Sequence, residues 1–128
     1  GNEIIRCTNV KRLLLKGNRI MAQGLVAISR NLGKSTTLVE LDLSDNSILA
    51  DVLALNAFCE ALRTNISLAS VNMEHNIIED EGAAMFADTL QMCPGIKVFK
   101  ISGQGVSKDV FKEVLKDGKD GKKKKGGK

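Results

Sequence analysis

The chain has 128 residues, the size of one domain, and 43% of them are apolar, enough for a hydrophobic core. It contains four Phe and neither Trp nor Tyr, which argues against a protein that stacks nucleic-acid bases on aromatic side chains. The net charge of +4 arises in residues 117–128, where six Lys accompany two Asp, because residues 1–116 contain 13 basic and 13 acidic side chains. The basic character therefore belongs to a terminal segment and not to a basic domain.

The sequence also favours an intracellular protein. No apolar stretch approaches the roughly 20 residues of a membrane-spanning helix, and the chain does not open with the pattern of a secretory signal peptide. Its three Cys are widely spaced and form no CxxC pair, which is typical of reduced thiols. We expect a cytoplasmic location.

A repeated pattern of apolar residues and one amide runs through the chain. Four stretches follow apolar-x-x-apolar-x-apolar-x-x-Asn-x-apolar, namely residues 10–20, 38–48, 68–78 and 96–106. The marker amides are Asn18, Asn46, Asn76 and Gln104, spaced 28, 30 and 28 residues apart. Alternating apolar positions predict a short strand with one buried face, and an Asn after it can satisfy backbone groups that a turn leaves unpaired. Stacked copies predict a ladder of amides, with Gln104 as a less regular fourth member.

Helical patterns fill the segments between these strands. Apolar pairs one helical turn apart recur at equivalent places, namely Ile28 with Leu32, Phe58 with Leu62, and Phe86 with Leu90. Such pairs place one face of each helix against the sheet. They predict helices over about residues 21–32, 51–63, 80–92 and 107–116.

Strands and helices alternating at this period resemble the ribonuclease-inhibitor-like leucine-rich repeat family, over roughly residues 4–115. The amino-acid sequence of residues 62–90 is similar to the repeats of the tropomodulins. The resemblance implies an α/β leucine-rich repeat solenoid, a right-handed βα superhelix with a short parallel sheet on its concave side and helices on its convex side. In such a fold Leu13, Leu41, Val71 and Phe99 must lie on neighbouring parallel strands.

The repeat pattern also predicts the domain organisation. We expect a leucine-rich repeat domain of about four repeats at residues 1–116. A Lys- and Gly-rich tail at residues 117–128 should be disordered, because it has no apolar residues to bury. Ile4 matches the last core position of a helix whose beginning is not in the sequence. This favours a C-terminal fragment of a longer array, and a naturally short array is the alternative.

The outward positions of the strands form the candidate binding surface, which we call the strand face. Strand by strand they are Arg12, Leu14 and Lys16; Glu40, Asp42 and Ser44; Ser70, Asn72 and Glu74; and Val98, Lys100 and Ser102. A basic edge, an acidic middle and a further Lys favour orientation and selectivity toward a protein partner. An ordinary solvated sheet face is the alternative. The predicted partner contacts are Arg12, Lys16, Glu40, Asp42, Asn72, Glu74, His75 and Lys100.

Little in the sequence favours catalysis. Residues 33–36 resemble the end of a phosphate-binding loop, but that motif needs a Gly where this chain has Ile28, and it must follow a strand and not a helix. His75 is the only His, and Glu74 and Asp45 alone make an incomplete set of metal ligands. We expect no catalytic residue, metal, cofactor or small-molecule substrate.

The expected function is protein–protein interaction, as an intracellular scaffold or adaptor. The tropomodulin resemblance implies a cytoskeletal partner such as actin. One alternative is a GTPase-activating module, because the Ran GTPase-activating proteins share this repeat type; Arg19 is then the residue to test. The other uses the basic tail, with Lys122, Lys123, Lys124 and Lys125, to contact nucleic acid, acidic tubulin tails or anionic membranes, unless the tail serves only solubility.

Overall fold

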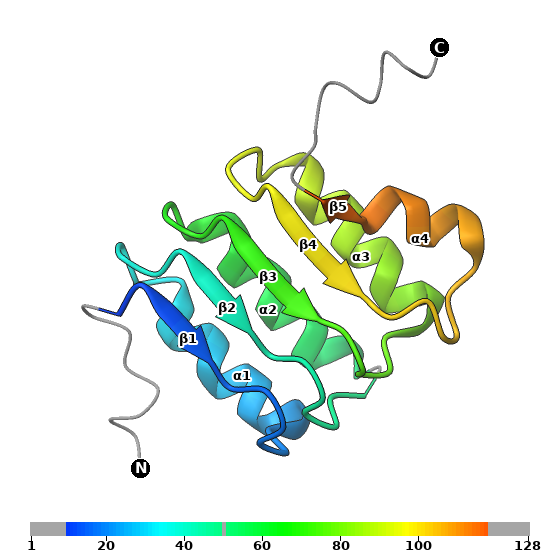
Figure 1. The fold of residues 1–128 in the computed structure, drawn as a ribbon, viewed down its shortest axis with the longest axis horizontal. Coiled ribbons are helices and arrows are strands. Elements are labelled where there is room, and N and C mark those ends of the chain that lie inside the picture. The colour runs from blue at the N-terminus through cyan, green and yellow to red at the C-terminus, as the bar shows by residue number, and fades with distance from the viewer. Residues whose placement is uncertain (1–9, 50, 118–128) are drawn as a thin grey trace.

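The computed structural model describes residues 10–49 and 51–117. Its elements in chain order are β1 (Arg12–Leu14), α1 (Met21–Leu32), β2 (Glu40–Asp42), α2 (Val52–Thr64), β3 (Ser70–Met73), α3 (Glu79–Gln91), β4 (Val98–Ile101), α4 (Lys108–Val114) and β5 (Lys116–Asp117). Figure 1 shows the strands side by side in one layer, with helices α1, α2 and α3 behind it. We call each strand, with its turn and the helix that follows, a coil.

The sheet has the predicted topology. Its strand order is β1-β2-β3-β4-β5, and the first four strands are parallel. Leu13 lies opposite Leu41, Leu41 opposite Val71, and Val71 opposite Phe99. The predicted α/β arrangement with a short parallel sheet is therefore confirmed.

The core lies between the sheet and the helices and runs continuously from coil to coil. Leu41, Val71 and Phe99 are fully buried. Phe86 of α3 packs edge-on against Phe58 of α2, with ring centroids 6.1 Å apart. Its ring also lies 5.0 Å from that of Phe99 on β4. The leucine and phenylalanine pattern that predicts the repeat thus forms a single interior.

The helices begin and end close to their predicted bounds. α1 spans the predicted 21–32, and α2 and α3 each differ by one residue at both ends. α2 begins after Asp51, whose Oδ1 accepts a hydrogen bond of 3.0 Å from the backbone N–H of Ala54. An Asp at this position satisfies a backbone donor that the first helical turn leaves unpaired.

The C-terminal end differs from the prediction. α4 ends at Val114 and not at residue 116, because the chain turns into β5, which pairs antiparallel with β4. Asp117, assigned to a disordered tail, lies in β5, so the domain boundary expected after residue 116 falls within a strand. Ile4 and the four Lys at 122–125 lie outside the described residues. Within the described part of the chain, no helix has the length and apolar character of a membrane span.

Candidate partner-binding face

The strand register arranges the strand face in rows that cross the sheet. Arg12 lies opposite Glu40, which in turn lies opposite Ser70. The next row is Leu14, Asp42, Asn72 and Lys100. Opposite residues on neighbouring strands lie roughly 5 Å apart. The charges predicted from the sequence therefore face one side of a single short sheet.

The first row holds an ion pair between neighbouring strands. The Arg12 Nε donates to the Glu40 Oε1 at 2.8 Å, and the two side chains are 64% and 38% exposed. An exposed pair of this kind adds little to stability, about 0–1 kcal/mol. The charges of Arg12 and Glu40 therefore largely neutralise each other.

Two side chains of the second row form hydrogen bonds within the protein. Asp42 Oδ1 accepts from the hydroxyl of Ser44 at 2.6 Å and from its backbone N–H at 2.9 Å. Asn72 Oδ1 accepts from the backbone N–H of Glu74 at 2.9 Å. Ser44 is buried, which corrects its placement on the open face: the bond to Asp42 holds it against the end of β2. Asp42 and Asn72 thus shape the strand ends as well as lining the face.

Three charged residues on this face form no ion pair among the described residues. Among the described residues the ion pairs are Arg12–Glu40 and Arg63–Glu60, so Lys16, Glu74 and Lys100 form none. Both lysines are exposed, and Glu74 is half-buried. Leu14 is 52% exposed in the same row as Asp42. The face therefore offers positive, negative and positive side chains in order across the sheet, with an apolar residue at one edge.

The predicted amide ladder forms at the turns after β1, β2 and β3. Asn46 and Asn76 are buried. The Asn76 Oδ1 accepts from the backbone N–H of Asn46 at 2.9 Å and of Ile48 at 3.0 Å. Its Nδ2 donates to the carbonyls of Leu43 and Met73 at 2.9 and 3.2 Å. One side chain therefore satisfies buried backbone groups of two successive coils, which fixes how those coils stack.

Gln104 is not a member of this ladder, contrary to the prediction. It is exposed, and none of the ladder bonds in the described part of the chain involves it. The hydroxyl of Ser102 accepts from the backbone N–H of His75 at 2.6 Å instead. His75 itself is exposed and adopts a positive φ of 62°. The last coil therefore meets the third through a hydroxyl that the repeat pattern did not single out.

A second series of polar contacts, unforeseen from the sequence, joins the helix C-termini. The Asn65 Nδ2 donates to the carbonyl of Leu32 at 2.8 Å, and the Cys93 Sγ contacts the carbonyl of Leu62 at 3.6 Å. Asn65 and Cys93 each lie 11 residues before a marker amide. This shared position in the repeat was the one sequence feature that could have predicted their similar contacts. Each side chain contacts a carbonyl near the C-terminus of the helix in the previous coil, α1 for Asn65 and α2 for Cys93. Carbonyls at a helix C-terminus lack intrahelical partners.

Lys116 performs the same role at the end of the array. The Lys116 Nζ donates to the carbonyls of Leu90, Cys93 and Ile96 at 3.4, 3.4 and 3.0 Å.

Cys59 and Cys93 are free and buried, and burial raises the pKa of both thiols. Neither cysteine forms the low-pKa thiol that nucleophilic catalysis needs.

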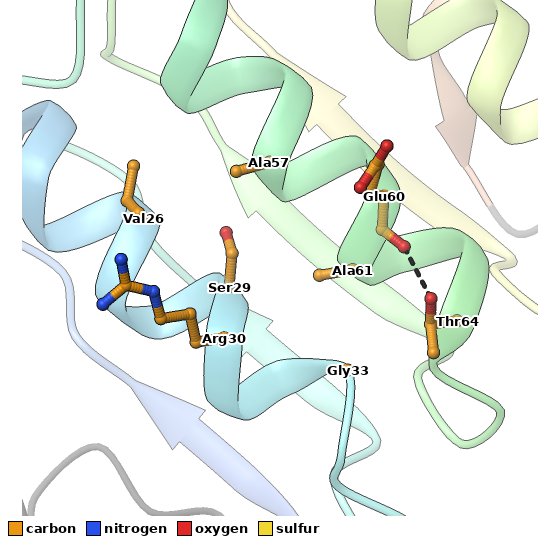
Figure 2. A pocket seen from close by; sticks show the side chains of 8 residues that line it. All are labelled: Val26, Ser29, Arg30, Gly33, Ala57, Glu60, Ala61 and Thr64. Carbon is orange, nitrogen blue, oxygen red and sulfur yellow. Dashed lines mark hydrogen bonds between the residues drawn. The ribbon is translucent and has the colours of Figure 1, made fainter.

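A groove of about 290 Å³ separates α1 from α2 on the helix side, away from the predicted contacts. Figure 2 shows the eight residues that line it, among them Ser29, Gly33 and Ala61, and the bond from the Thr64 hydroxyl to the Glu60 carbonyl, 2.9 Å long. Small side chains let the two helices approach closely. Of the rejected phosphate-loop residues, Gly33 lines this groove, whereas Ser35 is buried.

The remaining sequence candidates lie apart. Arg19 is exposed and lies between β1 and α1, with a positive φ of 52°. Over residues 10–49 and 51–117, no group of three or more His, Cys, Asp and Glu side chains is arranged to hold a metal ion. The basic-tail residues 122–125 fall outside the described residues.

Comparison with protein families agrees with the repeat pattern. Residues 34–51 and 64–87 match the family model of the leucine-rich repeat. These two stretches are similar to leucine-rich repeats. The matched stretches include β2, β3 and the turns with Asn46 and Asn76, the part of the chain where the amide ladder is most complete. Comparison with curated proteins found no significant match. Leucine-rich repeat domains generally mediate protein–protein interaction and are typically not enzymes.

Proposed function

We propose that the chain is a protein–protein interaction module that binds its partner through the strand face, as part of a leucine-rich repeat solenoid. The supporting observation is the ordered set of Lys16, Glu74 and Lys100, which form no ion pair among the described residues. The sheet beneath them is held by a buried core and by the amide ladder, so their spacing is fixed before binding. A preorganised surface loses little conformational freedom on association.

The proposal extends to the cell compartment and the class of partner. Free, buried thiols at Cys59 and Cys93 suit a reducing cytoplasm. The resemblance of residues 62–90 to tropomodulin repeats places a cytoskeletal protein first among the partners to test, beginning with actin.

Charge reversal on the strand face tests the proposal. We expect the double variant Glu74→Lys with Lys100→Glu to weaken partner binding about tenfold or more, because like charges then oppose the partner's groups. The matched control is Lys34→Glu with Asp88→Lys, at exposed positions outside the strand face. Both double variants leave the net charge unchanged.

Co-sedimentation with filamentous actin is the first assay, and affinity capture followed by quantitative mass spectrometry is the second. The proposed function predicts that captured proteins are lost with the strand-face variant and retained with the control. Equal retention by both variants would contradict it. Failure to sediment with actin, together with strand-face-dependent capture of another protein, would refute only the cytoskeletal assignment to actin.

A further inference from the structure

The boundary between α1 and α2 differs from the boundary between α2 and α3. Gly33 and Arg63 both lie 13 residues before the marker amide that follows them, and Ala57 and Met85 both lie 19 residues before theirs. The Arg63 Nη1 reaches α3, where it donates to the Thr89 Oγ1 at 3.2 Å, and Met85 packs against the core. Long side chains therefore lie between α2 and α3 at places where the groove between α1 and α2 has none.

The backbone does not require a glycine at position 33. Gly33 has a φ of −63°, in the right-handed helical region that other residues adopt without strain. The nearest neighbours of a Cβ at this position would be two atoms of the Thr64 side chain, each 3.8 Å away, which is an ordinary van der Waals distance. Neither strain nor crowding explains the glycine, whereas its missing side chain leaves one end of the groove open.

The interior of the groove is apolar. Ala61 is buried and Ala57 is half-buried. Ser29 is buried as well, and its hydroxyl already donates to the carbonyl of Leu25 at 2.7 Å. Leu53, one helical turn before Ala57 on α2, is 81% exposed. The apolar surface therefore continues from the groove onto an exposed leucine, which favours an apolar occupant.

The two charged residues that line the groove differ in their partners. The Glu60 carboxylate lies 3.8 Å from the guanidinium of Arg63, on its own helix. Arg30 is exposed and forms no ion pair among the described residues. Figure 2 shows Arg30 on α1 and Glu60 on α2, on opposite sides of the groove. The unmatched charge at the groove is therefore positive, and a guanidinium binds a carboxylate well.

The elements around the groove favour a helix as its occupant. The backbone groups of α1 and α2 are paired within those helices, so a strand would find no backbone partners here. A helix pairs its own backbone groups and offers apolar side chains one turn apart. The volume of about 290 Å³ is at the lower limit for small-molecule sites, roughly 300–1,000 Å³. On α1 the groove extends from Val26 to Gly33, about 10 Å or two helical turns.

We propose that the groove between α1 and α2 is a second protein-binding surface, separate from the strand face, for an amphipathic α-helix of a partner protein. The helix places one apolar side chain over Ala57 and another against Leu53, and one of its carboxylates pairs with Arg30. Its side chains fill the space that Arg63 and Met85 fill between α2 and α3.

The probe is a synthetic alanine-rich peptide of about 18 residues, long enough to form a helix. It carries two Leu one turn apart and a Glu one turn beyond each Leu, so that it can bind in either direction. The control peptide has Lys in place of both Glu. A fluorescent label allows binding to the full chain to be followed by anisotropy. We expect saturable binding of the Glu peptide and about tenfold weaker binding of the Lys peptide.

Variants of the chain assign the binding to the groove. Arg30→Glu should weaken binding of the Glu peptide about tenfold, whereas Lys112→Glu, the same charge change at an exposed position of α4, should not. Ala57→Met should abolish binding, because it places the side chain of Met85 at the equivalent position and fills the groove. Its control is Ala84→Met, at an exposed position of α3. Arg30 is exposed, so its variant decides the outcome if Ala57→Met does not fold.

Nuclear magnetic resonance locates the bound peptide. The methyl signals of Val26 and Ala57 should shift when the peptide is added, and a soluble gadolinium chelate should broaden them in the free chain. Absence of saturable binding, equal binding of both peptides, or unchanged binding by Arg30→Glu would overturn the proposal. So would methyl signals that the chelate does not reach in the free chain, since the chain itself or a second copy then covers the groove.

The strand face provides the last control. The double variant Glu74→Lys with Lys100→Glu should bind the Glu peptide as the unchanged chain does, because its changes lie on the other side of the sheet. Loss of peptide binding in this variant would contradict a separate surface on the helices. Failure of the strand face to bind a partner would leave the result for the groove unaffected.

Discussion

The third and fourth coils meet the same requirement with different side chains. After β3 the amide of Asn76 is buried and satisfies backbone groups of two coils. After β4 Gln104 is exposed, and the hydroxyl of Ser102 bonds the turn before it. A buried amide is needed only where a turn is enclosed by further structure, so the pattern relaxes at the end of the array.

This difference teaches where the chain's stability resides. The middle coils combine the fully buried core with the amide ladder, whereas the last coil relies on a short helix, an antiparallel strand and Lys116. Equivalent substitutions in the two regions should therefore have unequal effects on the free energy of unfolding.

The largest difference is expected in the core. Phe86→Ala removes a fully buried ring that touches two others, and should lower the free energy of unfolding by about 3–5 kcal/mol. Phe111→Ala, on the half-buried side of α4, should cost about 1–2 kcal/mol. Urea unfolding followed by circular dichroism measures both. A larger effect at Phe111 would reverse the comparison.

The ladder gives the next largest effect. Asn76→Ala should lower the free energy of unfolding by about 2–3 kcal/mol, because the N–H groups of Asn46 and Ile48 lose their acceptor inside the protein. Gln104→Ala is the matched control and should change stability by less than about 0.5 kcal/mol. The same urea titration applies, and equal losses in the two variants would show that the ladder does not set stability.

Lys116 sharpens the comparison at the C-terminal end. Lys116→Met keeps much of the side chain's length but removes the donor to three carbonyls, and should cost about 1–2 kcal/mol. Lys112→Met, at an exposed position of α4, is the control and should change little. Thermal melting resolves such a difference in a domain of this size. Indistinguishable melting temperatures would contradict this role of Lys116 and would mean that α4 and β5 alone stabilise this end.

The smallest effect concerns alkaline pH. Burial raises the pKa of Cys59 and Cys93 above the ordinary thiol value, so the folded state keeps protons that the unfolded state releases. The free energy of unfolding should therefore fall as the pH rises past the unfolded thiol pKa, between about pH 8 and pH 10. Cys59→Ala should lessen that decline. The chain contains no Tyr, so no phenol titrates in this range, and an unchanged slope in the variant would refute the assignment.

The parts of the fold that repeat were predictable, and the parts that close it were not. The bounds of α1, the pairing of Leu13 with Leu41, and the amides of Asn46 and Asn76 follow from periodic patterns. β5 has two residues and no period, so the local sequence held no sign of it.

The site shows the same division. Alternation along the strands placed Arg12, Glu40 and Lys100 on one face. The burial of Ser44 and the role of Ser102 depend on bonds to a neighbouring side chain and to a backbone group 27 residues away. A repeat pattern describes which face a residue occupies but not which backbone group in the next coil it meets.

Native-state hydrogen exchange tests the central claim, that successive coils are locked together by buried amides over a shared core. The backbone amides of Asn46 and Ile48, which donate to the Asn76 Oδ1, should be strongly protected in the unchanged chain. In the Asn76→Ala variant these two amides should exchange much faster than the other amides of the core. Exchange of both at the unchanged rate in that variant would contradict the account.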